Sequence, residues 1–188
     1  MTTVYFVRHA EPDYNNHDDF LRPLTDKGIK DRIKVTNYLM DKNIDVVLSS
    51  PYIRAVDTVA HFAKNAGLSV EKVNDFRERK IDSSWIEDFN TFCKMQWHDF
   101  NYKLEGGESL NEVQQRNIRA LNDVLNKYQD KNIVIGTHGT ALSTIINYYD
   151  NRFNYDNFNV IRSLMPWIVK FVFDKYKYIS IELINLLK

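Results

Sequence analysis

The sequence predicts an α/β fold, a three-layer α/β/α sandwich whose sheet is mostly parallel and has an antiparallel edge. Three short, continuously apolar segments, at residues 2–7, 45–48 and 132–135, are typical of strands buried on both faces. Longer segments with helical spacing of apolar residues lie between them, and this alternation favours the α/β class. Residues 167–174 and 176–182 show a rough apolar and polar alternation, which predicts a terminal antiparallel hairpin.

The predicted helices carry recognisable end signals. Four helices are expected, at residues 25–41, 51–66, 108–128 and 139–149. Thr25 is a residue type that caps helix N-termini. Pro51 stands at a helix start, where its missing N–H costs nothing, and Gly67 follows the end of the same helix as a C-cap.

Length and charge limit the class of protein. The chain has 188 residues, so we expect one domain over 1–188. Lys and Arg together number 25, as do Asp and Glu, and a formal net charge of zero predicts no nucleic-acid or membrane partner. No stretch resembles a signal peptide or a membrane span, so a cytoplasmic location is expected. The single cysteine, Cys93, excludes an internal disulfide and a cysteine-built metal site.

Charged and imidazole side chains stand where three predicted strands end. Arg8 and His9 directly follow the first strand, and Arg54 lies in the first turn of the helix after the second. His138 follows the third strand and precedes a helix that begins at Gly139. Ligands of open α/β sheets bind beyond the carboxyl ends of the strands, so we expect these side chains to form one site.

Such a cluster suits a phosphate monoester, which carries close to two negative charges near neutral pH. The guanidiniums of Arg8 and Arg54 match phosphate oxygens, and the nearby helix N-termini add backbone N–H donors. A neutral His9 imidazole could attack phosphorus and form a phosphohistidine, while His138 donates to the transferring group. This inventory needs no metal ion or other cofactor.

Other phosphatase chemistries lack their motifs in this chain. Cys93 has Asp99 rather than arginine six positions on, which excludes the Cys-x5-Arg loop. No Asp-x-Asp motif and no Walker-type glycine loop occurs. His9 and His138 as metal ligands are disfavoured, because the adjacent arginines would repel a cation.

Five motifs in order resemble the signatures of the histidine phosphatase superfamily, the phosphoglycerate mutase-like family. They are R-H-A-E from Arg8, L-T-D-K-G from Leu24, S-P-x-x-R-A-x-x-T from Ser50, G-E-S-L from Gly107 and G-T-H-G from Gly136. The resemblance spans residues 1 to about 150 and implies the fold of that family.

The resemblance also implies roles. It makes His9 the phosphorylated residue and adds Asn15, six positions later, as a donor to phosphate beside Arg8, Arg54, His138 and Gly139. It implies a glutamate as the general acid, here Glu78, with a pKa raised for work near neutral pH. Asp82 is the alternative, because the glycine-containing stretch that often follows this glutamate in the family is absent here.

Residues 82–106 are expected to cover the site, and apolar residues at helical spacing predict a short amphipathic helix or a pair of helices there. The aromatics of this segment either close the core, or one of Trp85, Phe92 and Tyr102 faces the leaving group. Only about 30 residues separate Glu78 from the G-E-S-L motif. The family's mutases carry a longer insertion here, so a small-molecule phosphate monoesterase is favoured over mutase-type phosphotransfer. A non-catalytic domain that binds phosphorylated ligands is the third interpretation, and the oligomeric state stays open.

Overall fold

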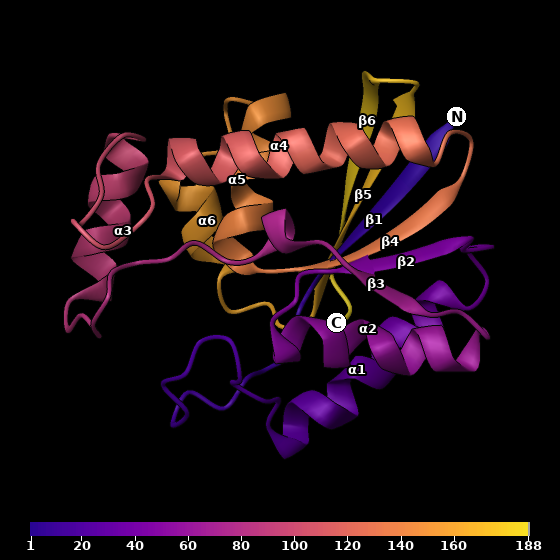
Figure 1. Ribbon diagram of the computed structural model, residues 1–188, viewed down its shortest axis with the longest axis horizontal. Helices are drawn as coiled ribbons and strands as arrows, with labels where there is room; N and C mark the ends of the chain where they lie inside the picture. The colour runs from indigo at the N-terminus through magenta and orange to yellow at the C-terminus, as the bar shows by residue number, and fades with distance from the viewer. Residues whose placement is uncertain (188) are drawn as a thin grey trace.

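The computed structural model describes residues 1–187 and contains one six-stranded sheet of order β3-β2-β4-β1-β5-β6 (Figure 1). The strands are β1 (Thr2–Arg8), β2 (Val46–Ser49), β3 (Val70–Lys72), β4 (Asn132–Thr137), β5 (Trp167–Asp174) and β6 (Lys177–Ile184). Strands β1 to β4 are mutually parallel, whereas β5 pairs antiparallel with both β1 and β6. The predicted mostly parallel sheet with an antiparallel edge is confirmed.

Helices cover both faces of the sheet, as the sequence predicts. α1 (Asp26–Leu39) and α2 (Ile53–Asn65) lie on one face, and α4 (Leu110–Lys127) and α5 (Gly139–Tyr149) lie on the other (Figure 1). Thr25 caps α1 by accepting the Gly28 N–H, as predicted, and Ser109 and Glu112 form a capping box at the start of α4. Gly67 follows α2 with a positive φ of 69°, a conformation that favours glycine.

Strand side chains alternate between two hydrophobic clusters. In β1, Val4 and Phe6 pack toward α4 and α5, whereas Tyr5 and Val7 pack toward α1 and α2. Because both faces are apolar, the strand reads as a continuous hydrophobic run. Its first polar side chain after this run is Arg8, at the end of the strand, and this is how the fold carries charge to that edge.

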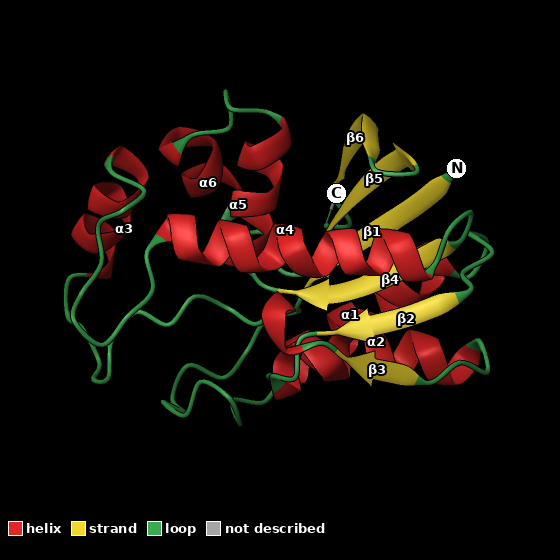
Figure 2. Cartoon of the chain, turned by 45° about the horizontal axis from the view of Figure 1, so that its top comes forward, coloured by secondary structure: helices red, strands yellow, loops and turns green. Residues whose placement is uncertain are grey.

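Three elements were not predicted, and several predicted helix boundaries differ from the observed ones by one or two residues. The edge strand β3 is too short and exposed to give a pattern, and the 3₁₀ turn η1 (Asn74–Phe76) and helix α6 (Tyr155–Ile161) each span one or two turns. Pro51 does not begin α2, because Tyr52 is its N-cap residue. The expected cover contains one helix, α3 (Phe89–His98). It lies beyond the N-terminal end of α4 (Figure 2). Within residues 1–187, no helix has the length and apolar character needed to cross a bilayer.

Candidate active site

The carboxyl ends of β1, β2 and β4 bring the predicted side chains together. The arrowheads of β2 and β4 point toward the end of the molecule where α3 lies (Figure 2). The strand ends are joined there by backbone hydrogen bonds, from His9 N to the Thr137 carbonyl at 3.1 Å and from Ser50 N to the Gly136 carbonyl at 2.8 Å. The rings of His9 and His138 consequently lie with centroids 5.2 Å apart.

The contacts of His9 define which ring nitrogen is free. His9 Nδ1 lies 2.8 Å from the Ala10 carbonyl oxygen, which can only accept, so the neutral ring carries its proton on Nδ1. The lone pair is then on Nε2, and Arg54 Nε donates to it at 3.3 Å. Burial, followed by the charges of Arg54 and Arg8, lowers the pKa of His9 well below its ordinary value. The imidazole is therefore neutral at physiological pH.

His138 is fully buried and has one free ring nitrogen. Its Nε2 lies 2.7 Å from Ser50 Oγ, which also accepts the Tyr52 N–H at 3.3 Å. The Ser50 hydroxyl can donate to His138 Nε2, and in that tautomer the imidazole carries its proton on Nδ1. Nδ1 has no hydrogen-bond partner within the described chain. Burial, together with the charge of Arg54, lowers the pKa of His138 well below its ordinary value.

Arg8 donates hydrogen bonds to carbonyls at and after the end of α6, a helix that was not predicted from the sequence. Its Nη1 donates to the carbonyl oxygens of Ile161 at 2.8 Å and Leu164 at 3.1 Å, at the end of α6. Its buried Nε has no partner within residues 1–187. A Cβ at Gly139 would lie 3.1 Å from the guanidinium, so glycine makes room for Arg8 at the start of α5. Burial lowers the pKa of Arg8 to about 10, and the group stays charged at neutral pH.

Arg54 shares a carboxylate with a third arginine. Arg54 Nη2 pairs with Asp19 Oδ1 at 2.9 Å, and Arg22 Nη1 pairs with the same oxygen at 3.0 Å. Arg22 is buried, and its charge contributes to the lowered pKa of His9 after burial and the two other arginines. Neither Asp19 nor Arg22 was predicted. The available signal was an Asp-x-x-Arg spacing directly before the Pro-Leu-Thr segment.

Glu78 lies at the N-terminus of α5, the helix whose N-cap residue is His138. Its Oε2 accepts the Thr140 N–H at 3.1 Å, and its Oε1 accepts the Ala141 N–H at 3.0 Å. These are backbone donors in the first turn of the helix that follows His138. Asp82 instead binds the cover segment, where Oδ1 accepts the Gly106 N–H at 3.1 Å. Of the two candidate acids, only Glu78 contacts the helix that begins at the site.

The predicted family is confirmed by comparison with known proteins. Residues 4–179, which are nearly the whole chain, match the histidine phosphatase superfamily (branch 1). The chain belongs to this superfamily. It is a phosphatase, a phosphoric monoester hydrolase, as the sequence predicts.

Relatives of this histidine phosphatase carry several names. A metal-independent phosphoserine phosphatase of Arabidopsis thaliana is 27% identical over 77% of this chain and 67% of its own length. A probable phosphoglycerate mutase GpmB of Erwinia tasmaniensis is 29% identical over 78% of this chain and 74% of its own. A mutant phosphoserine phosphatase of Entamoeba histolytica, solved with phosphoserine, has a TM-score of 0.79 at 20% identity and covers 100% of this chain and 98% of its own. The structural likeness confirms the fold.

The side chain of Asn15, the predicted phosphate donor, bonds within the loop that follows β1. It is exposed, and its Nδ2 donates to Asp13 Oδ1 at 3.0 Å in the loop after β1. The same loop continues to His17, whose ring stacks on exposed Trp85 with centroids 4.5 Å apart. Phe92 lies in the core, where it packs with Tyr102 at a centroid distance of 6.0 Å. These two aromatics therefore close the core of the cover segment, whereas Trp85 is exposed.

The two buried histidines predict a pH dependence of the histidine phosphatase's stability. Between the ordinary pKa of the unfolded chain, about 6.5, and the lower folded pKa values, the unfolded chain binds protons that the folded protein does not. Stability is therefore lost as pH falls below about 6.5, by about 1.4 kcal/mol per pH unit for each histidine.

Urea unfolding at several pH values between 7.5 and 5.5 measures this slope. The His9→Asn variant should lose one of the two contributions, while carboxylate contributions stay common to both proteins. An unchanged slope in this variant contradicts the burial of His9 in its neutral form.

Proposed function

We propose that this protein hydrolyses small phosphate monoesters through a phosphohistidine on His9, without a metal ion. The observation that carries the proposal is the state of His9, whose Nε2 lone pair lies among guanidiniums while Nδ1 is held by the Ala10 carbonyl. An arriving phosphoryl group displaces the Arg54 hydrogen bond and takes its place at Nε2. Arg8, Arg22 and Arg54 supply the positive charge that phosphoryl transfer requires.

In the first step, His9 Nε2 attacks phosphorus and the bond to the leaving oxygen breaks. The proton of the Glu78 carboxyl group goes to that oxygen, so an alcohol leaves. In the second step, Glu78 takes a proton from water, the water oxygen bonds to phosphorus, and the N–P bond breaks. His138 Nδ1–H, which has no partner of its own, donates to a phosphoryl oxygen throughout.

We also propose that residues 1–188 form one domain in which 82–106 covers the site. The stacking of Trp85 on His17 supports this, because it joins the cover to the loop that carries Asp19 and Arg22. The cover holds a single short helix, α3, which favours a water-accessible site and hydrolysis over mutase-type transfer. Phosphoserine is the first natural substrate to test, since relatives bear its name.

Hydrolysis of p-nitrophenyl phosphate in EDTA tests the proposal. We expect turnover, and acid-labile phosphate on His9 after rapid quenching. Isomerisation of 3-phosphoglycerate in place of hydrolysis would favour the mutase alternative. A phosphate-binding domain without turnover or labelled histidine would contradict the proposal.

The shared carboxylate predicts a measurable effect on phosphate affinity. Asp19 occupies the guanidiniums of Arg22 and Arg54 and repels an incoming dianion, by about 1 kcal/mol for two unit charges a few ångströms apart in water. We expect Asp19→Asn to bind inorganic phosphate about fivefold more tightly in isothermal titration. Asp41→Asn is the control. It removes one carboxylate charge just after the C-terminal end of α1 and should leave the phosphate affinity unchanged. Weaker binding by Asp19→Asn would mean that Asp19 instead orients the two arginines.

A further inference from the structure

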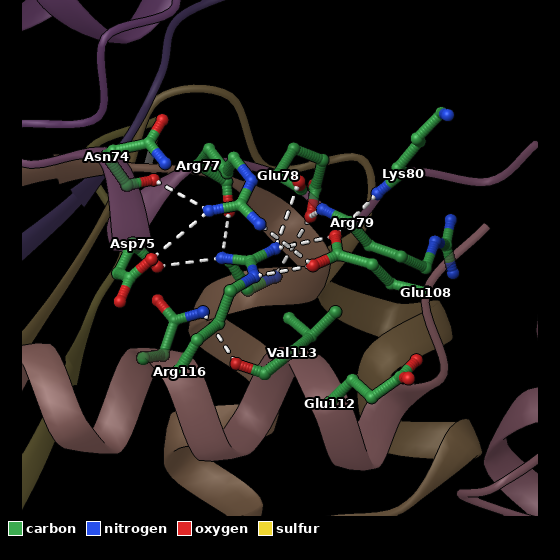
Figure 3. Close-up of polar contacts among 12 residues, drawn as sticks. Asn74, Asp75, Arg77, Glu78, Arg79, Lys80, Glu108, Glu112, Val113 and Arg116 are labelled. Carbon is green, nitrogen blue, oxygen red and sulfur yellow. Dashed lines mark hydrogen bonds and ion pairs between the residues drawn. The ribbon is translucent and has the colours of Figure 1, made fainter. Parts of the chain in front are cut away.

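The buried Arg116 of α4 uses every donor that it has on the Glu108 carboxylate and on backbone carbonyls around Glu78 (Figure 3). Its Nη1 donates to the carbonyl oxygens of Asp75 at 2.7 Å and Arg77 at 2.8 Å. Its Nη2 donates to the Glu78 carbonyl at 3.1 Å and to Glu108 Oε2 at 3.0 Å, and Nε donates to Glu108 Oε1 at 2.8 Å. A guanidinium has five N–H donors, so none remains for another purpose.

Glu108 completes the arrangement from the other side of the segment. Its Oε2 accepts the backbone N–H of Lys80 at 3.0 Å, and its Oε1 accepts from Arg77 Nη2 at 3.1 Å. The Glu108 backbone N–H in turn donates to the Lys80 carbonyl at 2.8 Å. Although burial acts to raise it, hydrogen bonds from Arg116 and the Lys80 N–H hold the pKa of Glu108 below its ordinary value. The backbone is thereby fixed both before and after Glu78.

Regular secondary structure does not fix the backbone around Glu78. Between η1 and α3, residues 77–88 contain no helix or strand, so Glu78 projects from an otherwise irregular segment. A buried pair of arginine and glutamate stabilises a fold no more than well-packed apolar side chains of similar volume. What the three hydrogen bonds from Arg116 to backbone carbonyls provide is a precise backbone position, and misplacing a reacting group by about 1 Å can cost about 100-fold in rate.

We propose that Arg116 and Glu108 are positioning residues that aim the Glu78 carboxyl group at the leaving oxygen. This inference rests on the proposed function, in which Glu78 is the general acid. The pair does not touch the substrate. It acts through the backbone of residues 75–80, while Thr140 and Ala141 hold the carboxyl group itself.

The test compares leaving groups in the Arg116→Lys and Glu108→Gln variants. A p-nitrophenolate leaves without protonation, whereas the alkoxide of phosphoserine requires the acid. In the first turnover, measured by quenched flow, we expect little change in the rate of phosphohistidine formation from p-nitrophenyl phosphate and a loss of about 10- to 100-fold in this rate with phosphoserine. Arg119→Lys is the matched control, because the exposed Arg119 lies on the same helix and contacts the half-buried carboxylate of Asp75 rather than the backbone. Equal losses on both substrates, or the same selectivity in Arg119→Lys, overturn the inference.

A double-mutant cycle separates positioning from a structural role. In a Glu78→Gln background, Arg116→Lys should cause no further selective loss with phosphoserine, because the group that it positions is already gone. Additive losses would show that Arg116 acts independently of Glu78 and would overturn the inference. If Arg116→Lys does not fold, the same cycle with Glu78→Gln is measured with Glu108→Gln. Failure to trap phosphohistidine in the wild-type protein would instead refute the proposed function.

Discussion

The His9→Asn variant is expected to lose hydrolysis of p-nitrophenyl phosphate, with kcat lower on the order of 10⁴-fold or more. Asparagine can still donate to the Ala10 carbonyl, as His9 Nδ1 does, so the buried acceptor stays satisfied. It offers no lone pair where Nε2 lies. The loss therefore reports the nucleophile rather than a collapse of the site.

His61→Asn is the control for this result. His61 lies on α2 and bonds Thr36 Oγ1 through its own Nδ1, away from the strand ends. It should retain wild-type turnover, and both variants should still bind inorganic phosphate in isothermal titration. Retention of acid-labile phosphate on the protein in His9→Asn would mean that another side chain is the nucleophile.

The second large effect is expected at Glu78 and depends on the substrate. Glu78→Gln cannot protonate the leaving alkoxide, so kcat with phosphoserine should fall about 10²- to 10⁴-fold. With p-nitrophenyl phosphate, formation of the phosphohistidine should change little, because that leaving group needs no proton. Quenched-flow measurement of the first turnover isolates this step from the later attack of water.

Asp82→Asn is the matched comparison, since Asp82 was the alternative acid in the sequence. Its carboxylate accepts the N–H groups of Ser83 and Gly106 within the cover segment. We expect it to keep the wild-type dependence on the leaving group. If Asp82→Asn shows the selective loss and Glu78→Gln does not, the assignment of the acid is wrong. Unfolding temperatures of both variants guard against a trivial loss of structure.

Most of the architecture could be predicted because its signals are local. The strands β1, β2 and β4 are apolar on both sides, and Thr25 and Gly67 mark helix ends with side-chain and backbone chemistry of their own. The short edge strand β3 carries no such signal, and the capping box of Asn154 and Asn157 at the one- or two-turn helix α6 was not recognised in the sequence. The omission of α6 matters for the site, since the carbonyl of its last residue, Ile161, accepts a hydrogen bond from Arg8.

The sequence by itself determined which residues stand at the strand ends, because strand length and polarity are written in adjacent residues. Arg8, His9, Arg54 and His138 are brought together as predicted. Only the tertiary structure decided that Arg22 and Asp19 join them, that Asn15 turns to Asp13, and that Glu78 rather than Asp82 reaches α5. These arrangements depend on the paths of the loops. Long-range hydrogen bonds, such as those of Arg116, determine these paths. His9 could be identified as a candidate nucleophile from the sequence, but its neutral state follows from its burial among guanidiniums.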